Sequence, residues 1–467
     1  MNRQEFIKRA VKGSAALALL GTSCFKKDNL KKTNIIFILA DDLGYGDLSC
    51  YGQSKFNTPN IDRLAVEGMR FTDHYAGSTV CAPSRCSLMT GLHTGHAYIR
   101  GNSANGKRIS LRPQDLTVAE ILKQAKYTTG VIGKWGLGLN GTTGHPNKKG
   151  FDYWFGYLNQ RHAHNYYPEF LWKNEERYSL NGNKLTKPSA DGSGISIKKI
   201  QYSHDLFTRE ALSFIEHNKN GPFFLYLAYT IPHANNEAGE NGMEVPSDTP
   251  YSDKDWPQQQ KNLAAMITRM DGDIGKIIKL LKNLGIDNNT IVFFSSDNGP
   301  HKEGGVNPNF FDSNGILRGI KRDLYEGGIR VPLIIRWPGK CKAGSISNHI
   351  SAFWDFMPTA IEIAGGEVPK NIDGISFVPT LLGEEHEQQK HDFLYWEFHK
   401  KKITNQAVRM GDWKGVHHGR DMPLELYDLK MDIGETKNIA EKHPEIVFKI
   451  KEYMKTARRE SEYWPLI

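Results

Sequence analysis

The chain has 467 residues, of which 39% are hydrophobic and 24% charged, and its formal net charge at pH 7 is +8. This length allows one large domain and a smaller one, and no basic stripe interleaved with aromatic residues supports nucleic-acid binding. Five cysteines are too few for a disulfide framework in a chain of this size.

Residues 1–24 have the pattern of an export signal. Basic residues precede the short apolar run AALALLG, and small residues lead to Cys24. The run is too short for a stable membrane span. Lipid attachment at Cys24 and ordinary cleavage after Ser23 both stay open, because Leu20 lies one position too far from Cys24 for the usual lipoprotein motif. We expect an exported protein, periplasmic or lipid-anchored at the bacterial cell envelope.

Between residues 33 and 379, short uninterrupted apolar runs alternate with helical patterns, which is typical of a parallel sheet covered by helices on both faces. Polar residues follow the ends of four of these runs. The runs are NIIFILA before Asp41 and Asp42, TTGVIG before Lys134, PFFLYLAYT before His233, and TIVFFSS before Asp297 and Asn298. Ligands bind beyond the carboxyl ends of the strands in an open α/β sheet, so we expect these side chains to gather at one edge.

The oxygen-bearing members of this group indicate a metal site. Asp41, Asp42, Asp297 and Asn298 offer hard oxygen ligands without histidine or cysteine, which suits Ca²⁺ or Mg²⁺ better than zinc. Cationic side chains around such an ion would hold a tetrahedral oxyanion.

The stretch VCAPSRCSLMTG, residues 80–91, predicts a helix that begins near Cys81. Pro83 suits a first helical turn, and Gly91 suits a helix end. Cys81 would then lie at the helix N-terminus, where free N–H groups and the helix dipole favour negative charge. On this stretch alone, a buried structural cysteine is the alternative.

From about residue 380 the apolar runs become shorter, and charged turns separate them. The stretch PEIVFKIKEYMKTARRES has the pattern of an amphipathic helix. We therefore predict a small antiparallel sheet packed with one helix in residues 380–467.

Taken together, these motifs resemble those of the type I sulfatases of the alkaline phosphatase superfamily, in particular bacterial polysaccharide-degrading sulfatases. CAPSR matches the C-x-P-S-R signature, and DDLGYGD, TGVIGKWGLG, SSDNGPH and LRGIKRDLYEGGIRVP match in order. The resemblance runs from about residue 33 to the C-terminus. It implies an alkaline-phosphatase-like α/β fold, with a large mixed, mostly parallel sheet flanked by helices in residues 33–379 and a smaller C-terminal α+β subdomain.

The resemblance also implies hydrolysis of sulfate esters, with O-sulfated carbohydrates as substrates. In this family a formylglycine-generating maturation enzyme oxidises the signature cysteine, so Cys81 is the expected precursor of an aldehyde whose hydrate attacks sulfur, with Arg85 stabilising the hydrate. The family's calcium ligands correspond to Asp41, Asp42, Asp297 and Asn298, with the residue at 81. Its sulfate-binding lysines correspond to Lys134 and Lys321, and its general acid for the leaving oxygen to His233.

The chain departs from the family at Gly136, where many relatives have a histidine that helps to break down the sulfated intermediate. His162 or His164, in the stretch NQRHAHNYYPEF, would supply that imidazole or contact the sugar. A polar insertion loop with surface histidines is the alternative. The stretches GKWGLG and RHAHNYYP resemble those of a subgroup of polysaccharide-degrading bacterial sulfatases that is linked to sulfated galactose or N-acetylgalactosamine.

Two other functions stay open. A phosphoesterase of the same superfamily would normally have Ser or Thr in place of Cys81. A non-catalytic glycan-binding lipoprotein would have no reason to keep Arg85 and Lys321 together with the other polar residues. In the C-terminal part, Trp396, Glu397 and His399 are candidates to face a sugar, with core packing as the alternative for Trp396.

Overall fold

The computed structural model describes residues 32–400 and 403–467. Thr33–Ile467 form one compact unit. The predicted signal in residues 1–24, which includes Cys24, lies outside the described residues. Among the helices of the described part, none is long and apolar enough to cross a membrane.

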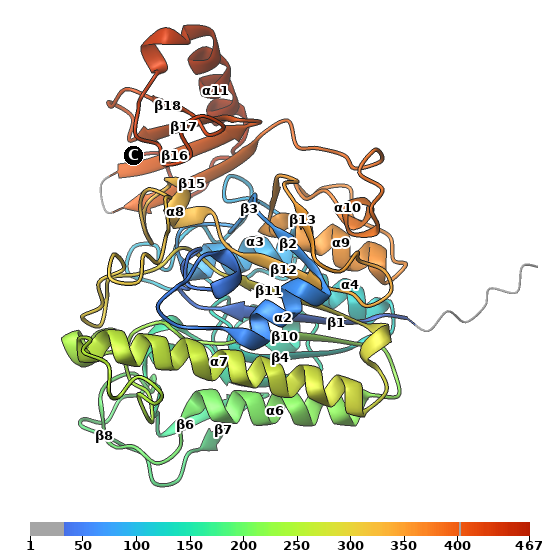
Figure 1. Cartoon of the computed structure of the whole chain (residues 1–467), viewed down its shortest axis with the longest axis vertical. Helices are drawn as coiled ribbons and strands as arrows, with labels where there is room; N and C mark the ends of the chain where they lie inside the picture. The colour runs from blue at the N-terminus through green and yellow to red at the C-terminus, as the bar shows by residue number, and fades with distance from the viewer. Residues whose placement is uncertain (1–31, 401–402) are drawn as a thin grey trace, which may run out of the picture. The chain divides into compact units, whose positions relative to one another are not determined.

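A ten-stranded sheet forms the centre of this unit (Figure 1). The strands β11, β1, β10, β4 and β5 run parallel to one another, whereas β12 and β6 are antiparallel to the strands they flank. The prediction of a large mixed, mostly parallel sheet is confirmed. In spatial order the strands are β13 (Ser345–Ser347), β2 (Met69–Phe71), β12 (Leu333–Arg336), β11 (Thr290–Ser296), β1 (Asn34–Ala40), β10 (Phe223–Ala228), β4 (Thr128–Lys134), β5 (Tyr153–Tyr157), β6 (Phe170–Lys173) and β7 (Glu176–Ser179).

Helices cover both faces of the sheet, which explains why the central strands are buried at every position and mostly apolar. Side chains of a strand alternate between the two faces, so Ile36 and Ile38 of β1 join one core and Ile35 and Phe37 join the other. The first core contains α2 (Pro59–Glu67), α6 (Ser203–Asn218) and α7 (Gln258–Asn283), and the second contains α3 (Cys81–Thr90), α4 (Val118–Gln124) and α9 (Phe356–Ile363).

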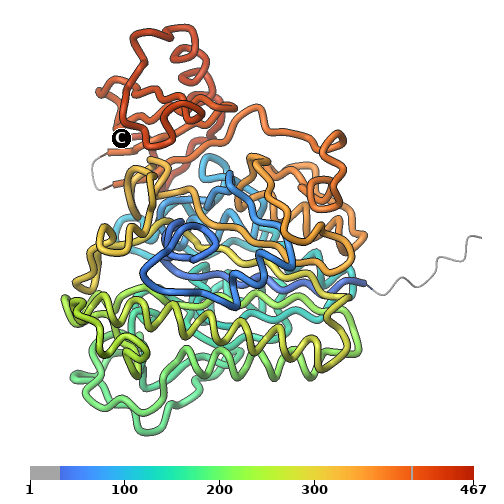
Figure 2. The backbone as a smooth tube through the Cα atoms, in the orientation of Figure 1, coloured from blue at the N-terminus to red at the C-terminus, as the bar shows by residue number. Residues whose placement is uncertain are grey.

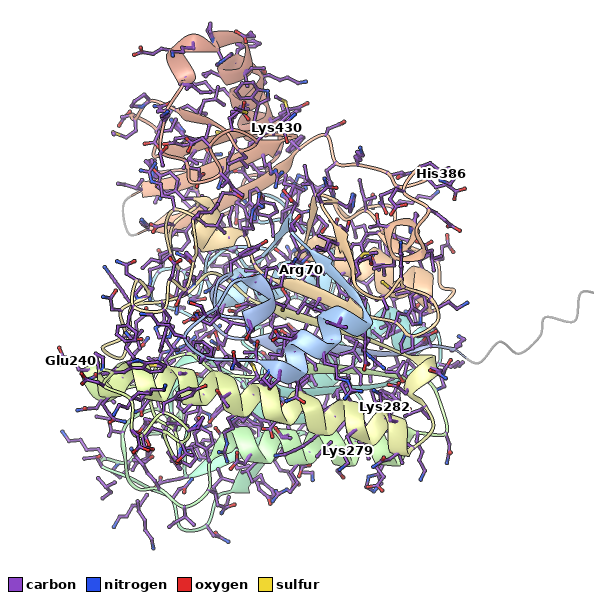
Figure 3. The ribbon with its side chains drawn as sticks, in the orientation of Figure 1. Arg70, Glu240, Lys279, Lys282, His386 and Lys430 are labelled. Carbon is purple, nitrogen blue, oxygen red and sulfur yellow. The ribbon has the colours of Figure 1, made fainter. Side chains whose placement is uncertain are left out.

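The long helices α6 and α7 lie side by side on one face of the sheet, and Figure 2 shows their backbones running next to each other. The outer face of α7 is polar, with Lys279 and Lys282 exposed (Figure 3). The remaining short elements are β3 (His74–Tyr75), β8 (Lys184–Leu185), β9 (Ser196–Lys198), β14 (Ser351–Ala352), α5 (Gln160–His164), α8 (Glu326–Ile329) and α10 (Val378–Leu382).

A second, four-stranded antiparallel sheet consists of β15 (Leu394–Lys400), β16 (Ile403–Met410), β17 (Trp413–His418) and β18 (Glu425–Asp428). One of its faces packs against α11 (Pro444–Thr456) through Ile450 and Met454. The predicted antiparallel sheet with one helix is confirmed. The division of the chain at residues 379 and 380 stays a prediction.

The other face of this sheet packs on the main body of the unit. Trp396 is fully buried beside Tyr75 and Trp354, and its indole N–H donates to the carbonyl of Ala76. Trp396 therefore has the core-packing role. Glu397 and His399 bond to each other at 2.9 Å and do not line the pocket described below.

Candidate active site

The polar residues predicted at the strand ends meet at one edge of the large sheet. Ala40 at the end of β1 pairs in register with Ser296 at the end of β11, so the residues that follow the two strands begin at the same level. Likewise, Ala228 of β10 pairs with Gly133 of β4, which places Lys134 one residue further on. The structure thus brings together Asp41, Asp42, Lys134, His233, Asp297 and Asn298, all of them buried.

Oxygen atoms of the strand-end residues form a compact cluster. The Asn298 side-chain amide donates to Asp42 Oδ1 at 2.7 Å, and the Asp42 backbone N–H donates to Asp297 Oδ1 at 3.1 Å. Asp41 Oδ1 and Asn298 Oδ1 are buried without any hydrogen-bond partner. Buried acceptors without donors are unfavourable, and a cation between them would satisfy both. The donor set therefore fits a divalent metal that prefers oxygen.

The charges around these carboxylates are unequal. Burial raises the pKa of Asp41, but the charges of Lys134 and Arg85 outweigh burial and hold the pKa at about 2. Burial and the charge of Asp41 raise the pKa of Asp297 to about 7, although Arg85 lies against it. An additional cation beside Asp297 would lower this pKa and keep the carboxylate ionised.

Three cationic side chains pair with the three carboxylates. Lys134 Nζ donates to Asp41 Oδ2 at 2.6 Å, and Lys321 Nζ donates to Asp42 Oδ2 at 2.6 Å. Arg85 donates to Asp297 Oδ2 from Nε at 3.0 Å and from Nη2 at 2.8 Å. These contacts fix the orientation of each cationic group at the edge of the sheet.

His233 lies beside the second lysine. Its Nδ1 donates to the carbonyl of Ala234 at 2.6 Å, and its Nε2 accepts from Lys321 Nζ at 3.1 Å. Burial and the charge of Lys321 lower the pKa of His233 well below its ordinary value. The hydrogen bond at Nδ1 therefore leaves Nε2 as the nitrogen that faces the site.

Cys81 is the first residue of α3, as the sequence predicts. Val80 before it is extended, and the helix ends at Gly91, whose φ of 69° suits glycine. The backbone N–H of Ala82 donates to Asn102 Oδ1 at 3.0 Å, and the side-chain amide of Asn102 lies 3.9 Å from the Cys81 sulfur. One ligand atom from each of Asp41, Cys81 and Asp297 lies within 4.8 Å of the others.

A polar cavity of about 400 Å³ opens beside Cys81. Of the two histidines predicted to reach it, only His164 lines it. Its Nδ1 contacts Glu237 at 3.0 Å, and its ring stacks on His233 at 4.8 Å. His162 is fully buried elsewhere, with Nε2 at 3.0 Å from the carbonyl of Phe170. The lining comprises Cys81, Asn102, Ser103, Gly106, Arg108, Gln160, Arg161, His164, Asp191, His233, Asn236, Lys321 and Arg322.

Comparisons with known proteins identify the family of this chain. The family model described as Sulfatase matches residues 33–366, and the model described as N-sulphoglucosamine sulphohydrolase, C-terminal, matches residues 319–460. The chain belongs to the sulfatase family. The protein is therefore a sulfuric ester hydrolase.

This sulfatase has relatives that align along most of its length. It is 31% identical to an N-acetylgalactosamine-6-O-sulfatase of Bacteroides thetaiotaomicron, over 95% of this chain and 97% of the relative. It is 34% identical to the N-acetylgalactosamine-6-sulfatase of Rattus norvegicus, over 82% of this chain and 70% of the relative. The crystal structure of Ps i-CgsB in complex with k-i-k-neocarrahexaose superimposes with a TM-score of 0.78 at 28% identity, covering 93% of this chain and 95% of that one.

The sulfatase site contains residues that sequence reasoning did not single out. His301 is buried behind the carboxylates, with Nδ1 at 3.3 Å from Glu303, and Glu303 lies 3.7 Å from Lys321. Burial disfavours the charged form of His301, but the nearby carboxylates of Glu303 and Asp42 raise its pKa. The only signal for His301 was its place at the end of SSDNGPH, three positions after the predicted metal ligand Asn298.

Proposed function

We propose that this sulfatase releases sulfate from O-sulfated galactose or N-acetylgalactosamine units of glycans. The observation that carries the proposal is Cys81 at a polar cavity, next to a buried cluster of carboxylates and lysines. A cavity of about 400 Å³ is large enough for a sulfated sugar unit. Two of the relatives are N-acetylgalactosamine-6-sulfatases, and one of the similar solved structures holds a neocarrahexaose.

Position 81 would carry the nucleophile. In the proposal, a maturation enzyme converts Cys81 to formylglycine, and the hydrated aldehyde supplies the hydroxyl that attacks sulfur. Arg85, held rigidly by Asp297 and by the carbonyl of Lys134 at 2.5 Å, would stabilise that hydrate. Lys321 lines the cavity and Lys134 acts electrostatically on Cys81, so both are placed to neutralise sulfate oxygens.

The metal in the proposal is calcium, with magnesium as the alternative. Asp41, Asp42, Asp297 and Asn298 would hold it, together with the residue at 81. When bound, the ion would neutralise the carboxylates and lower the pKa of a hydroxyl at position 81.

Two histidines would handle protons. The ring of His233 is fixed through Nδ1, and its Nε2 accepts a hydrogen bond from the Lys321 ammonium at 3.1 Å. Nε2 would therefore take a proton from Lys321 and pass it to the leaving oxygen of the sugar, which leaves Lys321 neutral until it is protonated again. His164 is likewise fixed through Nδ1 by Glu237, so its Nε2 would take the proton from the second hydroxyl of the hydrate or contact the sugar. Its pKa is lowered by burial, against the charge of Glu237, which keeps the ring neutral and able to accept a proton.

Export completes the proposal. The basic and apolar pattern of residues 1–24 supports passage across the cell membrane, and Cys24 would carry a lipid anchor if the signal is cleaved before it.

The test is sulfate release by the exported protein from sulfated mono- and disaccharides, with calcium added and with calcium chelated. We expect release only from sugars with an ester sulfate, and loss of release on chelation. Turnover of phosphate esters at a higher rate than sulfate esters would contradict the proposal.

A further inference from the structure

The space beside Gly136 holds a different side chain from the histidine of relatives. Gly136 has a φ of +82°, and a Cβ atom at this position would lie 2.8 Å from Gln160 Nε2. The side-chain amide of Gln160 donates to the carbonyl of Gly136 at 3.1 Å. Gln160 is buried at the start of α5, so its carboxamide has a fixed orientation. Gly136 therefore makes room for Gln160.

Gln160 in turn holds an arginine. Its Oε1 accepts a hydrogen bond from Arg108 Nη1, and Arg108 lines the cavity with Cys81. Arg108 follows a tight hairpin, in which Ala104 and Lys107 exchange two backbone hydrogen bonds of 2.9 Å. The φ angles of Asn105 (49°) and of the glycine after it (75°) are those of a two-residue hairpin turn that favours Asn-Gly. The hairpin and Gln160 together position the guanidinium.

Arg108 differs from the other cationic residues of the cavity because it forms no salt bridge with a carboxylate. Arg322 pairs with Glu303 at 2.5 Å, and Arg161 lies 3.5 Å from Glu237. Within residues 32–400 and 403–467, no carboxylate lies within 4.0 Å of the Arg108 guanidinium. Asp191 lines the same cavity and attracts Arg108 from beyond 4.0 Å, while its Oδ1 accepts hydrogen bonds from the side chains of Ser189 and Ser193. The partly buried guanidinium keeps donors free for a ligand.

We propose that Arg108 binds a second anionic group of the substrate, a carboxylate or a sulfate, next to the ester that is cleaved. The guanidinium fork matches the paired oxygens of both groups. The inference rests on the proposed function, since it adds a specificity determinant to a site that takes sulfated sugars. In this arrangement Gly136 fixes Gln160, and Gln160 positions the guanidinium of Arg108.

The experiment compares three substrates with the same scissile sulfate ester on N-acetylgalactosamine. One has no other charge, one has a second sulfate, and one is linked to a uronic acid. For Arg108→Ala we expect kcat/KM to fall roughly 10- to 100-fold on a substrate with the recognised second anion, mainly through KM. The fall on the singly charged sugar should stay under about threefold, and the arm that loses most identifies the anion. Arg108→Lys should lie between wild type and alanine.

Lys107→Ala is the matched control, because it removes an exposed positive charge from the same hairpin and should leave all three substrates unchanged. An equal loss on all three substrates, or no loss on any, would overturn the inference. If Arg108→Ala does not fold, Gln160→Ala should lower kcat/KM most on the same doubly charged substrate, by a smaller factor. If Gln160→Ala shows no such selective loss, the inference is also overturned.

Binding separates this inference from the proposed function. In the Cys81→Ala background, calorimetry should show that the doubly charged sugars bind more tightly and that Arg108→Ala removes the difference. That result without turnover of any sugar by the wild type would reject the proposed function and keep the inference. Equal affinity for all three sugars would reject the inference whatever the wild type cleaves.

Discussion

Burial raises the pKa of the Cys81 thiol above its ordinary value, although Lys134 acts against it. An unmodified thiol here stays neutral near neutral pH, and a neutral thiol is a poor nucleophile. The cationic surroundings of Cys81 are therefore better suited to an oxygen nucleophile and an anionic substrate than to thiolate chemistry. These surroundings agree with the proposed conversion of Cys81 to formylglycine.

Replacing this residue tests the nucleophile. We expect Cys81→Ala to lower sulfate release by about 10³-fold or more, because the nucleophile is lost. Melting should stay close to wild type, since the side chain is small. The wild-type peptide should be about 18 Da lighter than its sequence mass where formylglycine has formed.

Cys86 provides the control for Cys81. It is buried in the same helix, within the core below the sheet edge, and lines no part of the cavity. Cys86→Ala should lower stability by about 1 kcal/mol and keep its activity per folded molecule. Full turnover by Cys81→Ala would reject the mechanism.

The two neighbouring histidines should give opposite results. His164→Ala should reduce turnover: a burst of alcohol followed by a stall indicates a base, and a raised KM with kcat nearly kept indicates a sugar contact. His162→Ala should mainly lower the unfolding free energy, by about 1–3 kcal/mol, because it removes a buried ring packed on Tyr157 and Phe170. Stopped-flow kinetics and urea unfolding measure the two effects. Wild-type kinetics for His164→Ala would exclude both roles.

The place of a site residue could be predicted from the sequence where the residue follows a recognisable strand. Asp41 and Asp297 were predictable because each follows an apolar strand directly, and the ends of parallel strands meet at one edge. The contact of Arg108 with Gln160 joins segments 52 positions apart. Both segments lack a periodic pattern, so no rule of spacing predicts that they meet.

Among the elements, the central parallel strands were predictable, and the antiparallel strands that flank them were not. β1, β10 and β11 are buried throughout and carry long apolar runs, because helices cover them on both faces. β7 is exposed at every residue, and β12 has only four residues, so neither carries a long apolar run. Their antiparallel pairing depends on tertiary packing that the sequence pattern does not encode.

Metal removal tests the junction between β1 and β11. Their ends carry Asp42, Asp297 and Asn298, and two buried oxygens of the cluster lack partners. We expect a chelator to abolish sulfate release and to lower the melting temperature by several degrees, since an ion at 100 times its Kd contributes about 2.7 kcal/mol. Calcium should restore both. Unchanged melting and activity after exhaustive chelation would show that no ion is held there.

Within the described unit, the small sheet is joined to the main body by charge as well as by apolar packing. Lys414 of β17 is fully buried and lies 2.8 Å from Glu326 of α8 and 3.0 Å from Glu435. The backbone N–H of Glu326 also donates to Glu435 at 2.7 Å. The sequence predicted the small sheet but not this ion cluster, because its members lie about ninety and about twenty positions apart.

The cluster should make stability depend on pH. Burial and the charge of Glu326 raise the pKa of Glu435 to about 7, although Lys414 acts against them. In the unfolded chain this group titrates near its ordinary pKa of 4.5. Between these two values the folded protein binds more protons, so the unfolding free energy falls as pH rises.

Glu435→Gln removes the titration, while all other groups are the same in both proteins. The wild type should therefore lose about 1–3 kcal/mol relative to Glu435→Gln between pH 4.5 and 8, measured by urea unfolding. Glu445→Gln, at an exposed carboxylate, should follow the wild type. Parallel pH curves for wild type and Glu435→Gln would show that Glu435 is ionised in the folded state throughout this range.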